Sequence, residues 1–304
     1  MGNFSKTTME DLRNLPRVQL TEEQKKSDLA DIFDRPQADV GQKKIDILNG
    51  GPGNAQLALP IEKRSDLFLP GYQSMEDGYC IMSDGTGFVA NRTFFPDATP
   101  EMFDWWFNFH PLDDIRLAMW LQNGHMTCRI PELYVHTDES GISQATRNWG
   151  KEHFPVESFD GVEDCGEVCI RFFSPQEFGL DMHKVLVSPV KAFAAASCFW
   201  YKESLILFGE EDAKKFLAMD PDIRVGFNSF LHTARPVEGG CEVRSRFWNG
   251  KYFENGTVHN TRFPDGFDVS EVTWKMYRHT IQEFANLASF LPEVYNRYDG
   301  KITK

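Results

Sequence analysis

Apolar residues recur with the spacing of a helix near the C-terminus of this chain. One row, advancing in steps of three and four, contains Val272, Met276, His279, Glu283, Asn286 and Phe290. The other side is also apolar and contains Trp274, Tyr277, Ile281, Phe284, Leu287 and Ala288. A helix that is apolar nearly all round is a buried helix. The pattern therefore predicts that His279 and Glu283 lie in the interior, one turn apart on one face.

Capping residues define the expected ends of this helix. Asp268 is a good N-cap, and Glu271 stands three residues further on, as in a capping box. Because a proline removes a helical hydrogen bond, we expect the helix to run to about Phe290 and to stop before Pro292.

Strand-like segments precede this helix. Tyr79–Met82 and Gly87–Phe94 flank a Ser-Asp-Gly-Thr turn and predict a hairpin. The Thr99-Pro100 pair is expected to begin a short helix that reaches Phe109. Further strands are expected at Leu117–Leu121, Met126–Ile130, Glu167–Phe173, Ala192–Tyr201, Ser204–Phe208, Val225–Thr233 and Cys241–Trp248. Many short strands and one long terminal helix predict an α+β fold, with a curved antiparallel sheet wrapped on the helix.

The N-terminal part has a different pattern. A helix is expected from Thr21 to Phe33, where Thr21 and Gln24 have capping-box spacing. A Gly- and Pro-rich break follows this helix, and the density of aromatic residues rises after the break. We therefore expect an N-terminal extension over residues 1–65 and the main domain over residues 66–304.

Composition narrows the classes of partner. The formal net charge is −13, which disfavours binding to nucleic acid or to an anionic membrane surface. No apolar run is long enough to span a bilayer, and the N-terminus has no signal-peptide core. The six cysteines form no CxxC pair and indicate free thiols in the cytoplasm. A small molecule is the expected partner, and a homodimer is left open.

Aromatic residues are abundant, with 26 Phe, 7 Trp and 8 Tyr. They indicate either an aromatic-rich core or a cavity lined by rings, as small-molecule pockets usually are. The two interpretations are compatible with each other.

The His279 and Glu283 pair is the first candidate for chemistry. A buried glutamate costs several kcal/mol unless it is paired or binds a metal. At this spacing the two side chains can bind one metal ion, although an intrahelical hydrogen bond is the simpler alternative. The other histidines are His110, His125, His136, His153, His183, His232 and His259. Spacing alone does not choose among these, or between the acidic candidates Glu157 and Glu167.

Several segments together resemble one known family. They are Met75–Ala90, Thr99–Phe107 with His110, Arg244–Gly250 and His279–Tyr295. Over residues 70–296 the chain resembles the 2,4-diacetylphloroglucinol hydrolase and phloretin hydrolase family. The resemblance implies a Bet v 1-like helix-grip fold with a helical N-terminal extension. It also implies a hydrolase that cleaves a carbon–carbon bond next to a ketone on a phenolic or polyketide-like molecule.

The resemblance further implies a zinc ion (Zn2+) held by two histidines and two glutamates. His279 and Glu283 match directly, and His125 follows an Arg-Leu-Ala-Met-Trp segment at the place of the family's first histidine. Glu157 is the expected fourth ligand, with Glu167 as the alternative.

Roles in substrate binding and proton transfer also follow from the resemblance. His232 precedes the Arg-Ser-Arg motif and is expected to transfer protons, and Glu157 is expected to double as a base. Phe247, within that motif, is expected to contact the substrate. His110 is expected only to end the Trp-rich helix and to bond to a backbone carbonyl.

Two positions depart from the family pattern. Leu117 replaces a usual tyrosine, and Cys128 replaces a usual asparagine. Both are expected to contact the substrate, which therefore differs from the standard acylphloroglucinol. The alternative function is a helix-grip protein that only binds a small molecule, or an enzyme that modifies a polyketide without hydrolysis.

Overall fold

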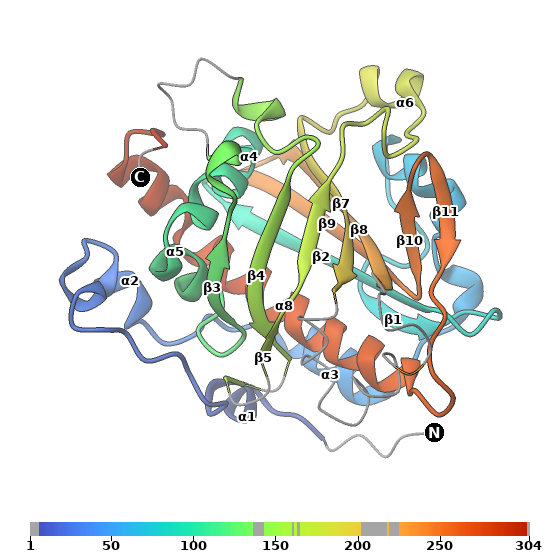
Figure 1. Ribbon diagram of the computed structural model, residues 1–304, viewed down its shortest axis with the longest axis horizontal. Coiled ribbons are helices and arrows are strands. Elements are labelled where there is room, and N and C mark those ends of the chain that lie inside the picture. Colours follow the sequence, from blue (N-terminus) through green and yellow to red (C-terminus); the bar gives the residue numbers. More distant parts are fainter. Residues whose placement is uncertain are drawn as a thin grey trace.

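The computed structural model describes residues 6–135, 143–159, 161–162, 165–201, 218 and 225–302. Within these residues a curved antiparallel sheet wraps around the long C-terminal helix α8 (Figure 1). The sheet follows the order β1-β2-β9-β8-β7-β6-β4-β3, with β5 paired to β4. This is the α+β helix-grip arrangement that the sequence predicts, and the predicted fold class is confirmed.

The strands are short to medium in length. They are β1 Gly78–Ile81, β2 Gly87–Pro96, β3 His125–Arg129, β4 Glu152–Ser158, β5 Cys165–Glu167, β6 Cys169–Phe172, β7 Ala192–Trp200, β8 Val225–Val237 and β9 Gly240–Asn249. A separate hairpin joins β10 Lys251–Glu254 to β11 Thr257–Asn260. The predicted hairpin of β1 and β2 is present. The predicted strand Ser204–Phe208 lies outside the described residues.

The described helices lie at the two ends of the chain and between the strands. They are α1 Met9–Arg13, α2 Ala30–Phe33, α3 Gln42–Gly50, α4 Pro100–Phe109, α5 Asp114–Trp120, α6 Met182–Leu186 and α8 Val269–Arg297. Single 3-10 segments occur at Gln24–Lys26, Ala55–Leu57, Ile61–Phe68, His110–Leu112, Glu132–Tyr134 and Gln144–Thr146. None of these helices is long and apolar enough to cross a membrane.

Helix α8 lies against the concave face of the sheet. Asp268 caps it, as predicted, by accepting hydrogen bonds of 2.9 and 3.2 Å from the first-turn backbone. The predicted stop before Pro292 is wrong, because the helix continues to Arg297. Leu291 and Val294 are fully buried there. Burying two such side chains gains about 1.5–3 kcal/mol each, which offsets the cost of about 3 kcal/mol for an interior proline.

Two other local predictions are wrong. Leu117–Leu121 is not a strand, because residues up to Trp120 belong to helix α5. The Asp113 side chain caps this helix, and a short apolar run cannot be assigned from periodicity alone. The predicted helix Thr21–Phe33 is broken at Ser27, whose backbone is extended with ψ of 146°.

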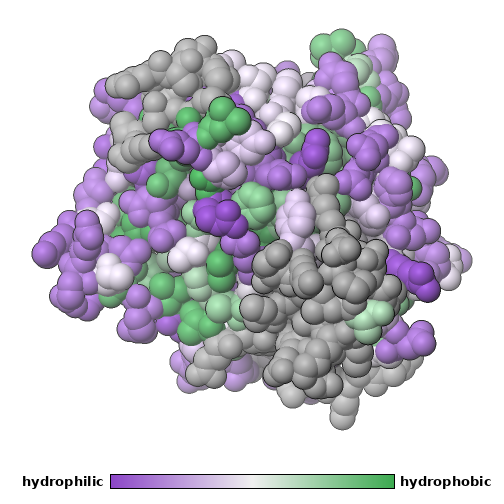
Figure 2. Space-filling model, viewed as in Figure 1, coloured by the Kyte–Doolittle hydropathy of each residue, from purple (hydrophilic) through white to green (hydrophobic). Residues whose placement is uncertain are grey.

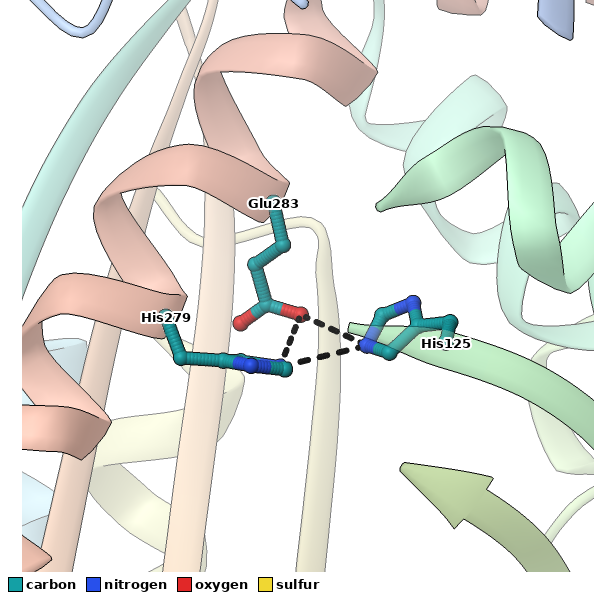
Figure 3. Close-up of side chains that lie close together, drawn as sticks. All are labelled: His125, His279 and Glu283. Carbon is teal, nitrogen blue, oxygen red and sulfur yellow. Dashed lines mark hydrogen bonds and ion pairs between the residues drawn. The ribbon is translucent and has the colours of Figure 1, made fainter. Parts of the chain in front are cut away.

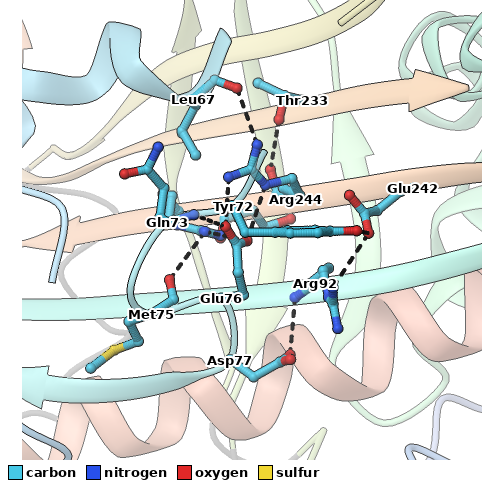
Figure 4. Close-up of polar contacts among 12 residues, drawn as sticks. Leu67, Tyr72, Gln73, Met75, Glu76, Asp77, Arg92, Thr233, Glu242 and Arg244 are labelled. Atoms are coloured by element: carbon cyan, nitrogen blue, oxygen red, sulfur yellow. Dashed lines mark hydrogen bonds and ion pairs between the residues drawn. The ribbon is translucent and has the colours of Figure 1, made fainter. Parts of the chain in front are cut away.

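The convex face of the sheet carries a buried ion cluster that joins two of the sequence motifs (Figure 4). Both oxygens of Glu76 are 2.6 Å from arginines, one from Arg244 and the other from Arg246. Burial alone would raise the pKa of Glu76, but hydrogen bonds and charges of the two arginines outweigh it and hold the pKa at about 2. Phe247 has the opposite strand parity and faces α8. The Arg-Ser-Arg motif therefore stabilises the fold.

The N-terminal segment packs against the same core as the sheet and α8. Leu12, Leu29 and Ile32 are at most 2 % exposed and belong to the hydrophobic cluster that contains Trp120 and Phe284. The division between residues 1–65 and the main domain stays a prediction. The outer surface is mostly hydrophilic on the face seen in Figure 2, with apolar areas scattered among polar ones.

Candidate active site

A cavity lies between the concave face of the sheet and helices α4, α5 and α8. Its walls are mainly apolar and aromatic, with Phe107, Leu117, Trp120, Phe159, Phe172, Phe230, Phe247 and Met276. Its polar lining consists of His110, His153, Glu157, Asn228, His232, His279 and Glu283. An aromatic cavity with a few convergent polar groups is the usual form of a small-molecule site.

Strand geometry explains why these side chains meet. Alternate residues of a strand face the same side, so His153 and Glu157 both point into the cavity from β4. On β3 the register shifts just after His125, which is paired with Glu157. This irregularity turns Cys128, three residues after His125, toward the same cavity.

His125, His279 and Glu283 form a compact group (Figure 3). His279 and Glu283 line the cavity, and His125 lies against them. The Nε2 atoms of the two histidines are 3.2 Å apart. Glu283 Oε2 lies 3.8 Å from each of these nitrogens, and Glu157 Oε1 lies 3.9 Å from His125 Nε2. Ligand atoms around a tetrahedral ion bound at about 2.0–2.1 Å are separated by roughly 3.4 Å. The observed separations therefore fit a single metal ion.

Burial dominates the electrostatics of this group. Burial lowers the pKa of His279 to about 4 and that of His125 well below its usual range, so both rings are neutral. Burial and the nearby Glu157 raise the pKa of Glu283 well above its usual range. No lysine or arginine is among the described residues that line the cavity. A bound metal ion would supply the missing positive charge.

Glu157 and Glu167 lie in different environments. The Glu157 side chain is only 23 % exposed, and burial raises its pKa to about 7. Glu167 pairs instead with Arg129 at 3.0 Å, on the outside of the protein. The structure therefore brings Glu157, and not Glu167, to the His125 and His279 group.

The other residues predicted for the site also line the cavity. These are Leu117, Cys128, His232 and Phe247. His110 bonds through Nδ1 to the Trp106 carbonyl at 2.7 Å, which confirms the expected backbone contact. It also lines the cavity, which the sequence interpretation did not anticipate.

Sequence reasoning missed two polar residues of the cavity. His153 and Asn228 are 4 % and 1 % exposed, and both line it. Asn228 Oδ1 and His232 Nδ1 have no hydrogen-bond partner among the described residues. Both missed residues stand four positions from a predicted site residue on the same strand, His153 from Glu157 and Asn228 from His232. That even spacing is the signal that identifies them.

Comparison of the sequence with known proteins finds similar hydrolases. A phloretin hydrolase from Eubacterium ramulus is 29 % identical over 289 residues, covering 92 % of this chain and 93 % of that protein. A 2,4-diacetylphloroglucinol hydrolase from a Pseudomonas species is 28 % identical over 256 residues, covering 78 % of this chain and 76 % of that protein. The crystal structure of Ara h 8.0201 covers 69 % of this chain and 99 % of its own at 10 % identity, and its TM-score of 0.36 is too low to bear on the fold.

The family comparison covers most of the chain. The model described as DAPG hydrolase PhiG domain matches residues 59–296, which include every cavity-lining residue named above. The resemblance stated from the sequence motifs and the predicted class of enzyme are thereby confirmed. This chain belongs to the DAPG hydrolase PhiG domain family and is a hydrolase.

Proposed function

We propose that this protein is a zinc-dependent hydrolase that cleaves the carbon–carbon bond next to a ketone on a phenolic or polyketide-like small molecule. The observation that carries the proposal is the convergence of two neutral imidazoles and two carboxyl groups at the wall of an aromatic cavity. The relatives named for phloretin and 2,4-diacetylphloroglucinol support the choice of substrate class.

The donor set favours zinc among the common metal ions. Imidazole nitrogens and carboxylate oxygens at tetrahedral separations are a usual zinc environment. His125, His279, Glu283 and Glu157 would hold the ion. When bound, zinc would act as a Lewis acid toward a ketone oxygen and toward water. A backbone hydrogen bond at Ser158 holds the His279 ring, as is common for metal-binding histidines.

The reaction consumes one water. Oxygen of the water bonds to the ketone carbon, the bond from that carbon to the ring breaks, and the ring carbon takes a proton. The products are a carboxylic acid and a ring with hydrogen in place of the acyl group. Glu157, whose pKa burial raises to about 7, is suited to take the proton from water. His232 lies across the cavity as a neutral imidazole, because burial lowers its pKa to about 3.

A neutral imidazole has one donor and one acceptor nitrogen. His232 can therefore take a proton from a ring hydroxyl and return one to the ring carbon. Its ring stacks on Phe230 with centroids 4.5 Å apart and lies 5.8 Å from Phe107, which fixes its plane. Exclusion of water by these aromatic walls protects the charge that develops on the ring carbon.

The cavity also indicates which substrates fit. His110, His153 and His232 lie around the rings of Phe107 and Phe172, with centroid distances of 4.9–5.8 Å. Burial lowers the pKa of His110 and of His153 to about 3, so these rings are neutral. They can bond to uncharged hydroxyl or carbonyl groups, and no lysine or arginine stands among the described residues of the lining to bind a carboxylate.

Leu117 and Cys128 make part of the cavity wall apolar where the family has polar contacts. We therefore infer a substrate with fewer or differently placed hydroxyl groups than an acylphloroglucinol. The six cysteines are free, in keeping with action in the reducing cytoplasm.

Metal analysis of the purified protein tests the zinc dependence. One zinc per chain supports the proposal, whereas a protein that binds no zinc even when zinc is added would contradict it.

The proposed function is tested by two variants and a substrate screen. His279→Ala is expected to lose zinc and activity together, and retention of both would end the proposal. His232→Gln is expected to keep its zinc while kcat falls by roughly 10²–10⁴-fold. In the screen, acylated phenols and β-diketones are incubated with the protein. Mass spectrometry then detects substrates that are cleaved into two products whose summed mass exceeds that of the substrate by one water.

A further inference from the structure

A group of buried amide side chains lies directly behind the proposed metal donors. Its members are Gln37, Gln122, Asn123, Gln282 and Asn286. Each is at most 5 % exposed, and none is among the residues that line the cavity. Burying an amide side chain without hydrogen-bond partners costs free energy of folding. The partners of these amides therefore indicate their role.

Asn286 joins three segments of the chain. Its Nδ2 donates to the carbonyls of Met119 and Trp120 at 2.9 and 3.0 Å, and its Oδ1 accepts from the Ala38 backbone at 3.1 Å. The two carbonyls end helix α5 and have no partner within that helix. The Trp120 indole donates to the Glu283 carbonyl at 3.0 Å. The end of α5 is therefore held against the turn of α8 that carries Glu283.

Asn123 makes the corresponding connection in the turn between α5 and β3. Its Nδ2 donates to the Leu12 carbonyl at 3.0 Å. It is also 3.4 Å from an amide oxygen of Gln37 and from one of Gln282. Only Gly124 separates Asn123 from His125, the first proposed metal ligand.

Gln122 binds the N-terminal segment from the same turn. Its side chain donates to the carbonyls of Phe33 and Arg35 at 2.8 and 3.1 Å. The backbone carbonyl of Gln122 accepts a hydrogen bond of 2.8 Å from the backbone N–H of Val18. Segments of the chain between residues 12 and 38 thus contact both the turn before His125 and helix α8.

We propose that residues 12–38, through Asn123 and Asn286, position the metal centre. The inference rests on the proposed metal function. His125 comes from the sheet, whereas His279 and Glu283 come from α8, so their mutual placement depends on what joins β3 to α8. Metal sites tolerate only a few tenths of an ångström of error in the placement of their ligands. The amide group supplies that connection, and the N-terminal segment completes it.

The test compares Asn286→Leu, which keeps side-chain volume but removes the amide, with two controls on the same helix. Glu293→Gln weakens the exposed 2.7 Å ion pair with Arg35, a contact of the same N-terminal segment that does not involve the amide group. Val294→Ala removes buried apolar volume from the core without touching an amide. Zinc affinity is measured by competition with a coloured chelator, and site geometry by the absorption spectrum of the Co2+-substituted protein.

Asn286→Leu is expected to weaken zinc binding by about 10–100-fold and to change the Co2+ spectrum, while both controls keep the wild-type affinity. The inference is overturned if Asn286→Leu binds zinc as the wild type does, or if Val294→Ala loses as much affinity at equal loss of stability. If Asn286→Leu does not fold, Asn123→Ala provides the same comparison. A wild-type protein that binds no zinc would instead refute the proposed function, and this inference with it.

Discussion

Glu76 and Glu283 are both buried glutamates, and the two faces of the sheet surround them with opposite partners. Glu76, on the convex face, meets two arginines whose hydrogen bonds and charges overcome burial and hold its pKa at about 2. Glu283, on the concave side, meets two neutral imidazoles, and burial with the neighbouring Glu157 raises its pKa. The first carboxylate is neutralised by the protein itself, and the second is not.

This difference distinguishes a structural carboxylate from one that serves a ligand. A buried charge that the chain neutralises needs nothing further and stabilises contacts between motifs. A buried carboxyl group beside neutral imidazoles has a cost that a bound cation would remove. Both motifs belong to the matched family region, and only the structure assigns them different tasks.

Removing the metal should give the largest loss of activity. It should act on the concave side of the sheet alone and leave the Glu76 cluster on the convex face intact. Treatment with a strong chelator is expected to lower kcat/KM by on the order of 10³-fold, because carbonyl activation is lost. Added Zn2+ should restore the activity. The Glu76 cluster is held by ion pairs with Arg244 and Arg246, so the fold should persist, as circular dichroism would show. Full activity in the chelated protein would show that the group around Glu283 does not depend on a metal ion.

Glu76→Gln should affect stability and not chemistry. It leaves the buried Arg244 and Arg246 without a carboxylate, and breaking such a buried pair typically costs about 3–5 kcal/mol. Denaturant unfolding would measure this loss of the free energy of unfolding. The folded variant should keep zinc binding and kcat/KM, and a matching fall in kcat/KM would show that the two faces are not independent.

The pH dependence of stability should have opposite signs on the two faces. Burial raises the pKa of Glu157 from 4.5 to about 7, so in the metal-free protein its contribution is complete below pH 4.5 and is lost as the pH rises through about 7. The pKa of Glu76 is lowered to about 2, so its contribution is present above pH 4.5 and is lost as the pH falls through about 2.

Glu157→Gln should therefore make the metal-free protein more stable than the wild type at pH 8, by up to about 3 kcal/mol. The two proteins should converge near pH 4. Thermal unfolding of both chelated proteins across this range measures the difference. A variant that is less stable than the wild type at pH 8 would show that Glu157 has a stabilising partner in the folded protein.

The smallest expected effect concerns substrate preference inside the cavity. Leu117→Tyr combined with Cys128→Asn restores the polar residues typical of the family. We compare kcat/KM for an acylphloroglucinol with kcat/KM for a less hydroxylated aryl ketone. The ratio of the first to the second should rise about ten-fold, which is the effect expected of one or two substrate contacts. Steady-state kinetics with both substrates test this. An unchanged ratio would show that these two positions do not select the substrate.

Much of the fold and the first pair of site residues could be predicted from local patterns. The α8 periodicity predicted a buried histidine and glutamate one turn apart, and both are buried. Turn and capping residues predicted the β1 and β2 hairpin and helix α4. These features depend on spacing within one segment, which the order of residues determines directly.

Tertiary structure decided what depends on contacts between distant segments. Glu157 and Glu167 have similar local surroundings in the sequence, and sheet register alone turns Glu157 toward His125 while Glu167 pairs with Arg129. Packing against the core carried α8 past Pro292, against the local signal.

The amide group behind the proposed metal donors could not be predicted for the same reason. Asn123 and Asn286 find their partners 111 and 248 residues away along the chain. The sequence by itself determined which chemical groups were available and which faces were buried. The closing of the sheet around α8 decided which of those groups meet, because hydrogen bonds and metal sites require a geometry that only the assembled chain provides.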